Sequence, residues 1–159
     1  MDERHRKQQE LYDRIWREGL TKGKDQYGNL QMNLQFLNET RLLQSKRKIL
    51  EVGCGAGTVV FELIRQGHEV VGIEISHEAV AHGLKRYGDI DLRVGVAEEL
   101  PFANEMFDIV LSFDLLEHIA EVDKHLREVH RVIRGGGYYL FQRLISALML
   151  SSKHYHKDQ

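Results

Sequence analysis

Residues 48–58 read KILEVGCGAGT, a short apolar run that leads directly into three glycines at alternate positions. A run of this length predicts a buried strand, and the glycines permit a tight turn that a ligand can approach with no Cβ in the way. A second apolar run, His68–Glu74, ends in a carboxylate 21 residues after Gly53. An acidic side chain at that spacing can accept hydrogen bonds from both ribose hydroxyls of an adenosine. Together the two features predict an adenosine-containing cofactor, whereas the glycines alone would also fit a purely structural turn.

The spacing of the glycines distinguishes between two classes of cofactor. The dinucleotide-binding fingerprint is G-x-G-x-x-G/A, but Thr58 stands where its third glycine belongs. Glu51 places a carboxylate beside the loop, where it would repel a pyrophosphate and would suit a ligand that carries an ammonium and a sulfonium group. The pattern therefore favours S-adenosylmethionine, and a nicotinamide-dependent oxidoreductase stays an alternative.

Apolar runs alternate with amphipathic stretches along the chain, and their order predicts the fold class. We expect five strands, at residues 48–52, 68–74, 90–96, 107–113 and 137–141, with helices at 59–66, 76–87 and 120–133. Strands that alternate with helices form parallel βαβ units, and near-continuously apolar strands are typical of a sheet that is covered on both faces. The sequence therefore predicts a doubly wound α/β domain with a mostly parallel sheet.

The length of 159 residues predicts one domain with three parts. We expect a helical cap over residues 1–46, in which a polar loop at 21–29 separates two helices. A cofactor-binding core over residues 47–143 follows, and then a short tail over residues 144–159 with room for one short helix or strand.

Composition excludes several classes of protein and of site. One cysteine, Cys54, rules out an internal disulfide framework and any zinc site with two or more cysteines. Nine histidines are present without an HExxH pair or a matching carboxylate cluster, so we expect no metal. No apolar run approaches the ~20 residues of a membrane helix, and the polar N-terminus has no secretory signal. These features predict a soluble, cytoplasmic protein.

The charge pattern gives little reason to expect a nucleic-acid partner. Lys and Arg number 22 against 24 Asp and Glu, a formal net charge of −2. The N-terminal stretch carries an excess of basic residues, but acidic and basic side chains interleave there with helical spacing. A solvated helix face accounts for this pattern better than a phosphate-binding arm.

Five stretches of the chain, in order, resemble the motifs of class I S-adenosylmethionine-dependent methyltransferases. They are ILEVGCGAG (Ile49–Gly57), VVGIEIS (Val70–Ser76), VAEELPF (Val96–Phe102), FDIVLSFDLLEHI (Phe107–Ile119) and LREVHRVIRGGG (Leu126–Gly137). The chain is most similar to the small-molecule branch that includes the quinone-biosynthesis enzymes. The resemblance implies a Rossmann-like methyltransferase fold, with S-adenosylmethionine as methyl donor and S-adenosylhomocysteine as product.

The resemblance also implies a set of cofactor-binding residues. They are Glu51, Gly53, Cys54, Gly55, Gly57, Glu74, Ile75, Ala97, Glu98 and Phe113. Glu51, Gly53 and Gly55 would surround the methionine end, Glu74 would hold the ribose hydroxyls, and Ile75 would pack on the adenine. Ala97 and Glu98 would border the adenine edge, and Phe113, followed by Asp114, would lie near the sulfonium.

Two positions leave alternatives open. Where the family often has an acidic residue for the adenine amino group, this chain has Val96, so either Glu98 substitutes or adenine is held less tightly. His118 is the candidate general base, which the reaction needs only if the acceptor carries a proton. A histidine that merely orders its loop is the alternative interpretation.

The end of the chain limits what the resemblance implies about activity. In the family the sheet continues beyond its fifth strand, whereas here strands 6 and 7 are expected to be missing. Either the form is truncated or rearranged, or a partner covers the edge. A homo-oligomer would then form through the edge of the fifth strand or through residues 144–150. We expect methyl transfer to a small-molecule acceptor, and the alternative is a protein that binds the cofactor without turnover.

Overall fold

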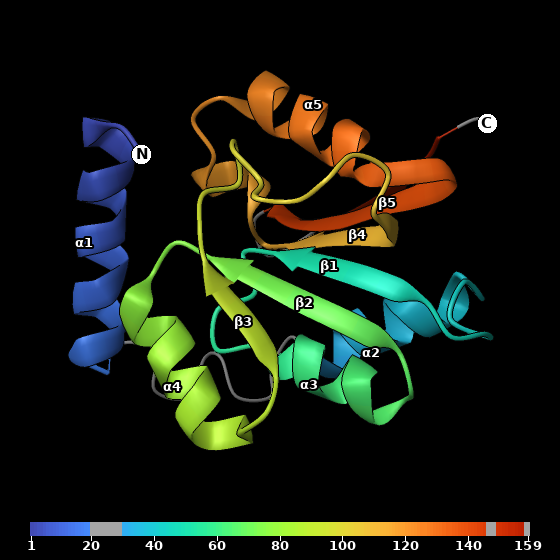
Figure 1. The fold of residues 1–159 in the computed structure, drawn as a ribbon, viewed down its shortest axis with the longest axis horizontal. Helices are drawn as coiled ribbons and strands as arrows, with labels where there is room; N and C mark the ends of the chain where they lie inside the picture. Colours follow the sequence, from blue (N-terminus) through green and yellow to red (C-terminus); the bar gives the residue numbers. More distant parts are fainter. Residues whose placement is uncertain (20–29, 146–148, 158–159) are drawn as a thin grey trace.

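A six-stranded sheet forms the centre of the computed structural model, which describes residues 1–19, 30–145 and 149–157. Its strand order is β3-β2-β1-β4-β5-β6 (Figure 1). The strands are β1 (Lys48–Val52), β2 (Glu69–Glu74), β3 (Asp91–Val94), β4 (Phe107–Phe113), β5 (Ile133–Ile145) and β6 (Met149–His156). Strands β1 to β5 pair in parallel, which confirms the predicted doubly wound, mostly parallel sheet.

Helices cover both faces of the sheet. Helices α2 (Leu30–Glu39), α3 (Thr58–Arg65) and α4 (His77–Tyr87) lie on one face, and α5 (Val122–Val132) lies on the other (Figure 1). Strand β1 shows why its sequence has consecutive apolar residues. Ile49 packs into the cluster under α2, α3 and α4, and Leu50 packs into the cluster under α5, and both side chains are fully buried.

Helix α1 (Glu3–Arg17) stands at the carboxyl ends of β1 and β2, beside α4 (Figure 1). It begins after Asp2, whose side chain accepts a hydrogen bond from the main-chain nitrogen of His5. Helices α1 and α2 both form within the stretch predicted as a helical cap, and α2 ends at Glu39. The loop predicted at residues 21–29 lies outside the described residues.

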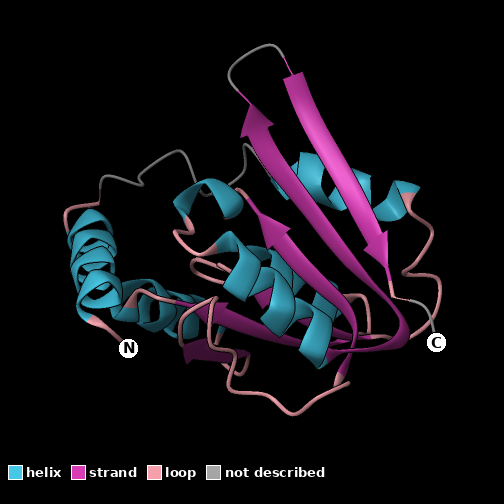
Figure 2. Ribbon diagram, turned by 90° about the horizontal axis from the view of Figure 1, so that it is seen from above, coloured by secondary structure: helices cyan, strands magenta, loops and turns pink. Residues whose placement is uncertain are grey.

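The C-terminal end of the sheet differs from the prediction. We expected the sheet to end at its fifth strand and residues 144–159 to form a tail, but β6 pairs antiparallel with β5 from Tyr138↔His156 to Ile145↔Met149. Figure 2 shows these two strands projecting together beyond the rest of the sheet. Because β6 occupies that edge of β5, the structure contradicts the prediction that two copies associate through the edge of the fifth strand. No seventh strand follows within the described part of the chain.

The sequence left room for one short helix or strand after residue 143, and the structure forms strand β6 there. The sequence Met149–His156 has no continuous apolar pattern, so periodicity gave no signal there. Strand β5 is also longer than the predicted 137–141, because a register shift opposite Phe107 and Ile109 lets it begin at Ile133. The side chains of residues 144–150 lie outside the description, so that predicted contact stays a prediction.

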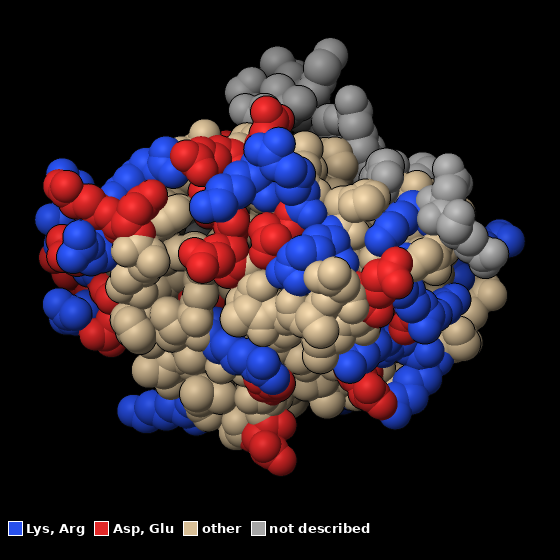
Figure 3. Space-filling model, turned by 45° about the horizontal axis from the view of Figure 1, so that its top comes forward, with Lys and Arg blue, Asp and Glu red and all other residues tan. Residues whose placement is uncertain are grey.

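The surface carries charges of both signs. On the face seen in Figure 3, Lys and Arg side chains lie among Asp and Glu side chains. This arrangement agrees with the interleaved charges of the sequence. Within the described residues, no helix has the length and apolar character needed to cross a membrane.

Candidate functional site

The loop after β1 is shaped by its glycines. Gly53, Gly55 and Gly57 have φ angles of 76°, 53° and 73°, in the left-handed region that favours glycine. The main-chain nitrogens of Gly53 and Cys54 both donate to the carbonyl oxygen of Ile73, at 2.8 and 3.0 Å. Gly57 caps the start of α3. The loop therefore turns sharply while it stays attached to the end of β2.

A fourth glycine lets α4 approach this loop. A Cβ on Gly83 would collide with the main-chain carbonyl of Ala56 and with the side chain of Leu92. Because the helix has no side chain at this position, its backbone can pack directly against the loop. Helix α4 therefore supports the glycine loop from behind.

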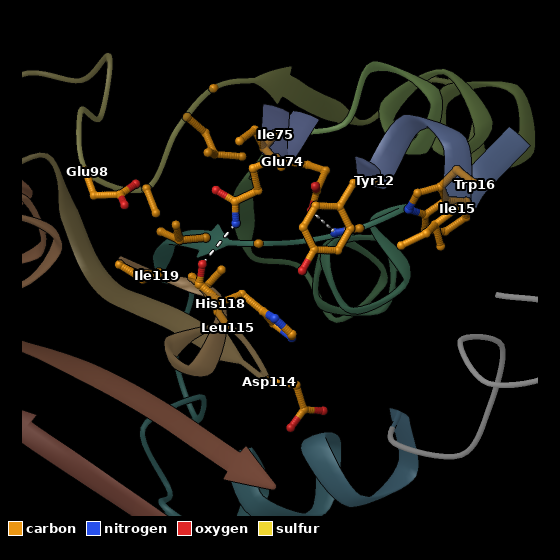
Figure 4. A pocket seen from close by; sticks show the side chains of 17 residues that line it. Tyr12, Ile15, Trp16, Glu74, Ile75, Glu98, Asp114, Leu115, His118 and Ile119 are labelled. Carbon is orange, nitrogen blue, oxygen red and sulfur yellow. Dashed lines mark hydrogen bonds between the residues drawn. The ribbon is translucent and has the colours of Figure 1, made fainter. Parts of the chain in front are cut away.

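Two cavities lie on either side of the glycine loop. The larger, of about 250 Å³, is enclosed by α1, the loop after β1 and the segments that follow β2, β3 and β4 (Figure 4). The smaller, of about 200 Å³, lies between the loop, α2 and the end of β4. Both are lined by Trp16, Gly53, Gly55 and Asp114. An elongated ligand could therefore lie across the loop with one end in each cavity.

Glu74 is held at the wall of the larger cavity by the main chain. Its Oε2 accepts from the nitrogen of Gly55 and its Oε1 accepts from the nitrogen of Ser76, both at 3.0 Å. Burial raises the pKa of Glu74 above its usual value, three main-chain hydrogen bonds lower it, and the charge of Asp13 adds to the rise. Each oxygen keeps a lone pair, so the carboxylate can still accept from two ligand hydroxyls.

Glu51 is the buried acid of the smaller cavity. The residue is 4% exposed, and its Oε2 has no hydrogen-bond partner. Burial raises its pKa to about 8, against a main-chain hydrogen bond with Val60, and the charge of Glu74 adds to the rise. An unpaired carboxyl group in a cavity wall is costly unless a partner supplies a hydrogen bond or a positive charge. Glu51 is therefore suited to bind an ammonium group.

Helix α1 closes the larger cavity from outside. Gln9 Nε2 donates to the carbonyl oxygen of Ile75 at 2.7 Å, and Gln8 Nε2 donates to that of His118 at 2.9 Å. Tyr12 and Trp16 point from the helix toward the cavity in Figure 4. The sequence interpretation missed these residues because it treated α1 only as a cap. Trp16, the one tryptophan of the chain, lies on the apolar stripe of that helix and could have indicated that α1 borders the cavity.

Further contacts fasten both ends of α1. Asp13 accepts from Ser76 Oγ at 2.6 Å and from the nitrogen of Glu78 at 3.1 Å, at the start of α4. Near the other end, His5 Nε2 lies 3.3 Å from Glu98 Oε2, outside hydrogen-bond geometry, and both side chains are buried. The helix thus bridges the segments that follow β2 and β3.

The structure brings most of the predicted cofactor residues to these cavities. The larger one is lined by Gly53, Gly55, Glu74, Ile75, Ala97 and Glu98, and the smaller one by Glu51, Gly53, Cys54, Gly55 and Phe113. Gly57 lines neither cavity and serves as the cap of α3. Val96 is buried and lines neither cavity. Asn33 of α2 is a buried polar residue of the smaller cavity that sequence reasoning missed.

The remaining candidate residues differ in their exposure. His118 is exposed and lines the larger cavity, with its ring edge-on to Tyr12 at 6.0 Å between centroids. Cys54 is buried, and burial raises the pKa of its thiol well above the usual value, so it is suited to packing. Among the residues that the structure describes, no group of three or more His, Cys, Asp or Glu side chains is arranged to hold a metal.

Comparisons with known proteins agree with this arrangement. A family model described as "Methyltransferase domain" matches residues 50–141. A probable S-adenosylmethionine-dependent methyltransferase of Mycolicibacterium smegmatis is 34% identical over 94 residues, which are 59% of this chain and 37% of that protein. A ubiquinone biosynthesis O-methyltransferase of Mesorhizobium japonicum is also 34% identical over 94 residues, 57% of this chain and 38% of that protein. The chain thus spans well under half the length of these curated relatives.

A solved structure is similar over most of this chain. The crystal structure of a Pyrococcus horikoshii protein matches with a TM-score of 0.66 and 25% identity, over 74% of this chain and 59% of that one.

Proposed function

Because the chain belongs to the methyltransferase-domain family, whose methyl donor is S-adenosylmethionine, we propose that it transfers the donor's methyl group to a small-molecule acceptor. One observation carries the proposal. Two buried carboxyl groups, Glu74 and Glu51, lie on opposite sides of one glycine loop, each in the wall of its own cavity. One suits ribose hydroxyls and the other suits an ammonium group, which are the two polar ends of this donor.

The donor would lie across the loop. Glu74 would accept from both ribose hydroxyls, and Ile75 would pack against the adenine, whose edge would meet Ala97 and Glu98. In the smaller cavity, Glu51 and Cys54 would lie beside the methionine end, and the backbone of the loop would pass under the sulfur. The unpartnered Oε2 of Glu51 supports this direction, because the reverse one would leave that carboxyl without a positive partner.

The remaining residues would align the acceptor and exclude water. When bound, S-adenosylmethionine supplies an activated methyl group on a sulfonium. Tyr12 and Trp16 of α1 would shield this group, and Phe113 and Asp114 would border the path of the acceptor. His118, at the rim of the larger cavity, would take the proton of an acceptor hydroxyl where the acceptor carries one.

The proposal extends to location and partners. We place the protein in the cytoplasm, with a small molecule as its acceptor, and we expect no nucleic acid among its substrates. A homo-oligomer through residues 144–150 remains part of the proposal, to be tested by the mass of the protein in solution at several concentrations.

Calorimetry followed by a transfer assay tests the proposal. We expect S-adenosylhomocysteine to bind and NAD not to bind, and binding of NAD alone would contradict the choice of cofactor. The transfer assay then uses S-adenosylmethionine with a radiolabelled methyl group and a panel of O-, N- and C-nucleophiles. Hydroxylated quinone-like compounds come first, because one relative is named a ubiquinone biosynthesis O-methyltransferase. Binding without transfer to any acceptor would favour the alternative of a protein that binds the cofactor without turnover.

A further inference from the structure

A fully buried histidine connects helix α5 to the wall of the larger cavity. His125 is 0% exposed, and both of its ring nitrogens have partners. Its Nδ1 lies 3.0 Å from the carbonyl oxygen of Ala97, and its Nε2 lies 3.0 Å from the hydroxyl of Tyr139 on β5. The proposed reaction makes no direct use of this pair, so its burial calls for another explanation.

The partners of His125 determine where its proton lies. A carbonyl oxygen can only accept, so Nδ1 carries the proton and donates to Ala97. In a neutral ring Nε2 then accepts, and the Tyr139 hydroxyl donates to it. Burial lowers the pKa of His125, against the hydrogen bond to Ala97 and the charge of Glu98. Burial raises the pKa of Tyr139 to about 12, against a hydrogen bond with Ser112. The hydrogen bonds therefore run in one direction, from Tyr139 through His125 to Ala97.

This chain of hydrogen bonds orients the peptide between Ala97 and Glu98. The peptide is trans and planar, so its N–H points away from the side on which its carbonyl meets His125. Both residues line the larger cavity. Within the turn itself, the nitrogen of Glu99 reaches the carbonyl of Val96 at a long 3.3 Å. Contacts from outside the turn therefore add to the hydrogen bond and the β-bridge that join Val96 to Glu99.

Helix α5 supplies such contacts along one face. His125, Glu128 and Arg131 follow one another at intervals of three residues, so they lie along the same side of the helix. Glu128 accepts from the nitrogen of Leu100 at 2.8 Å, and Arg131 donates to the carbonyls of Leu100 and Phe102 at 2.9 and 2.7 Å. His125 is the member of this row whose partner lines the cavity.

We propose that His125, oriented by the Tyr139 hydroxyl, positions the main chain at residues 97–98 to recognise the adenine edge of the cofactor. The inference rests on the proposed function, which places the adenine beside Ala97 and Glu98. Val96, just before them, offers no polar side chain. The peptide that His125 holds and the carboxylate of Glu98 would then recognise the adenine. A displaced peptide would recognise it poorly.

Binding of two ligands to wild type and to Tyr139→Phe tests the proposal. The ligands are S-adenosylhomocysteine and its inosine analogue, in which an oxygen replaces the 6-amino group. We expect wild type to prefer the adenine form. Tyr139→Phe removes one hydroxyl, and we expect about 3- to 10-fold weaker binding of S-adenosylhomocysteine. The ratio of the dissociation constants of the two ligands should move toward one. Tyr138→Phe, next along β5, is the matched control and should change neither value.

Two variants of His125 separate positioning from packing. His125→Leu removes the donor to Ala97, whereas His125→Asn offers an amide N–H near the position of Nδ1. We expect the Asn variant to restore part of the adenine preference that the Leu variant loses. Nitrogen NMR of the ligand-free protein should show the Nδ1-protonated ring, and Tyr139→Phe should shift the Glu98 amide signal.

The outcomes distinguish two kinds of failure. An unchanged adenine preference in folded Tyr139→Phe and in both His125 variants would overturn the positioning role and leave the proposed function intact. A wild-type chain that binds no S-adenosylhomocysteine would overturn the proposed function, and with it the role of His125 toward adenine.

Discussion

The main-chain nitrogen of Gly55 donates to Glu74 Oε2 at 3.0 Å, which joins the loop after β1 to the last residue of β2. The two residues are 19 positions apart in the sequence, and the parallel pairing of β1 with β2 brings them together. The hydrogen bond fixes the carboxylate before any ligand arrives, so less conformational freedom is lost on binding. A rigid acceptor at the carboxyl end of adjacent strands is what recognition of a ribose requires.

Loss of the Glu74 carboxylate should weaken cofactor binding strongly. Hydrogen bonds to a charged group contribute about 1.5–3 kcal/mol, so Glu74→Ala should weaken S-adenosylhomocysteine binding by about 10- to 100-fold. Calorimetry measures the effect. Glu69→Ala, at the exposed start of the same strand, is the control and should bind as wild type does. Equal affinity in Glu74→Ala would show that another group holds the ribose.

The buried carboxyl of Glu51 should make stability depend on pH. Its pKa of about 8 lies above the ordinary value of 4.5, so the folded state keeps a proton that the unfolded chain releases as pH rises. The protonated group therefore contributes stability that is fully present below about pH 4.5 and is lost as pH rises through 8. Glu51→Gln cannot ionise, so its free energy of unfolding relative to wild type should increase over this range, by a few kcal/mol at most, about 1.4 for each unit of pKa shift.

Urea unfolding at pH 5, 6.5 and 8 checks this difference, with Glu62→Gln of α3 as the control. A difference that is the same at all three pH values would mean that Glu51 is already ionised in the folded protein.

A ligand with an ammonium group should also release a proton on binding below pH 8. Adenosine, which lacks that group, should not, and buffers of different ionisation enthalpy distinguish the two in calorimetry.

An alanine at Gly83 should destabilise the fold although it favours the helix. In an exposed helix, Gly→Ala is worth about 1 kcal/mol of stability. Here the added Cβ would meet the Ala56 carbonyl, which belongs to the backbone and cannot rotate away. Overpacking of this kind costs about 1–3 kcal/mol, so the collision should outweigh the helix preference. Thermal unfolding measures the result, and Leu84→Ala, an exposed position of α4, should change stability little. A more stable Gly83→Ala would show that the loop can move aside.

The sequence predicted the elements whose signals are local. Ile49 and Leu50 belong to opposite faces of a covered sheet, so apolar residues stand at consecutive positions, and this pattern identifies β1. Glu74 could be predicted because it ends the next apolar run. These elements repeat a strand–loop–helix pattern in which each signal lies within a few residues of the structure that it predicts.

The features that the sequence did not predict depend on contacts between residues that are distant in the sequence. Asp13 and Ser76 are 63 positions apart, and nothing in α1 alone indicates that it docks on the start of α4. Likewise His125 was read only as one of nine histidines, since its partners on β5 and after β3 come together only in the fold. Tertiary hydrogen bonds of this kind leave no periodic pattern in the sequence.

Removal of the Asp13 carboxylate should loosen α1 and weaken cofactor binding together. This group accepts from Ser76 Oγ and from the nitrogen of Glu78, and loss of both hydrogen bonds should cost about 1–3 kcal/mol of docking energy. Trp16, the one tryptophan of the chain, lies on the same helix and lines both cavities, so its fluorescence reports the position of α1.

In Asp13→Ala we therefore expect red-shifted emission and stronger quenching by acrylamide, with S-adenosylhomocysteine bound several-fold more weakly. In wild type, the same ligand should protect Trp16 from acrylamide, because it would fill the cavities that the ring borders. Glu10→Ala is the control, because it removes a carboxylate from an exposed position of the same helix. It should behave as wild type does. If Asp13→Ala lost affinity with unchanged quenching, the carboxylate would act through Ser76 and Glu74, on the ribose site, and α1 would be held in place by Gln8, Gln9 and its other contacts.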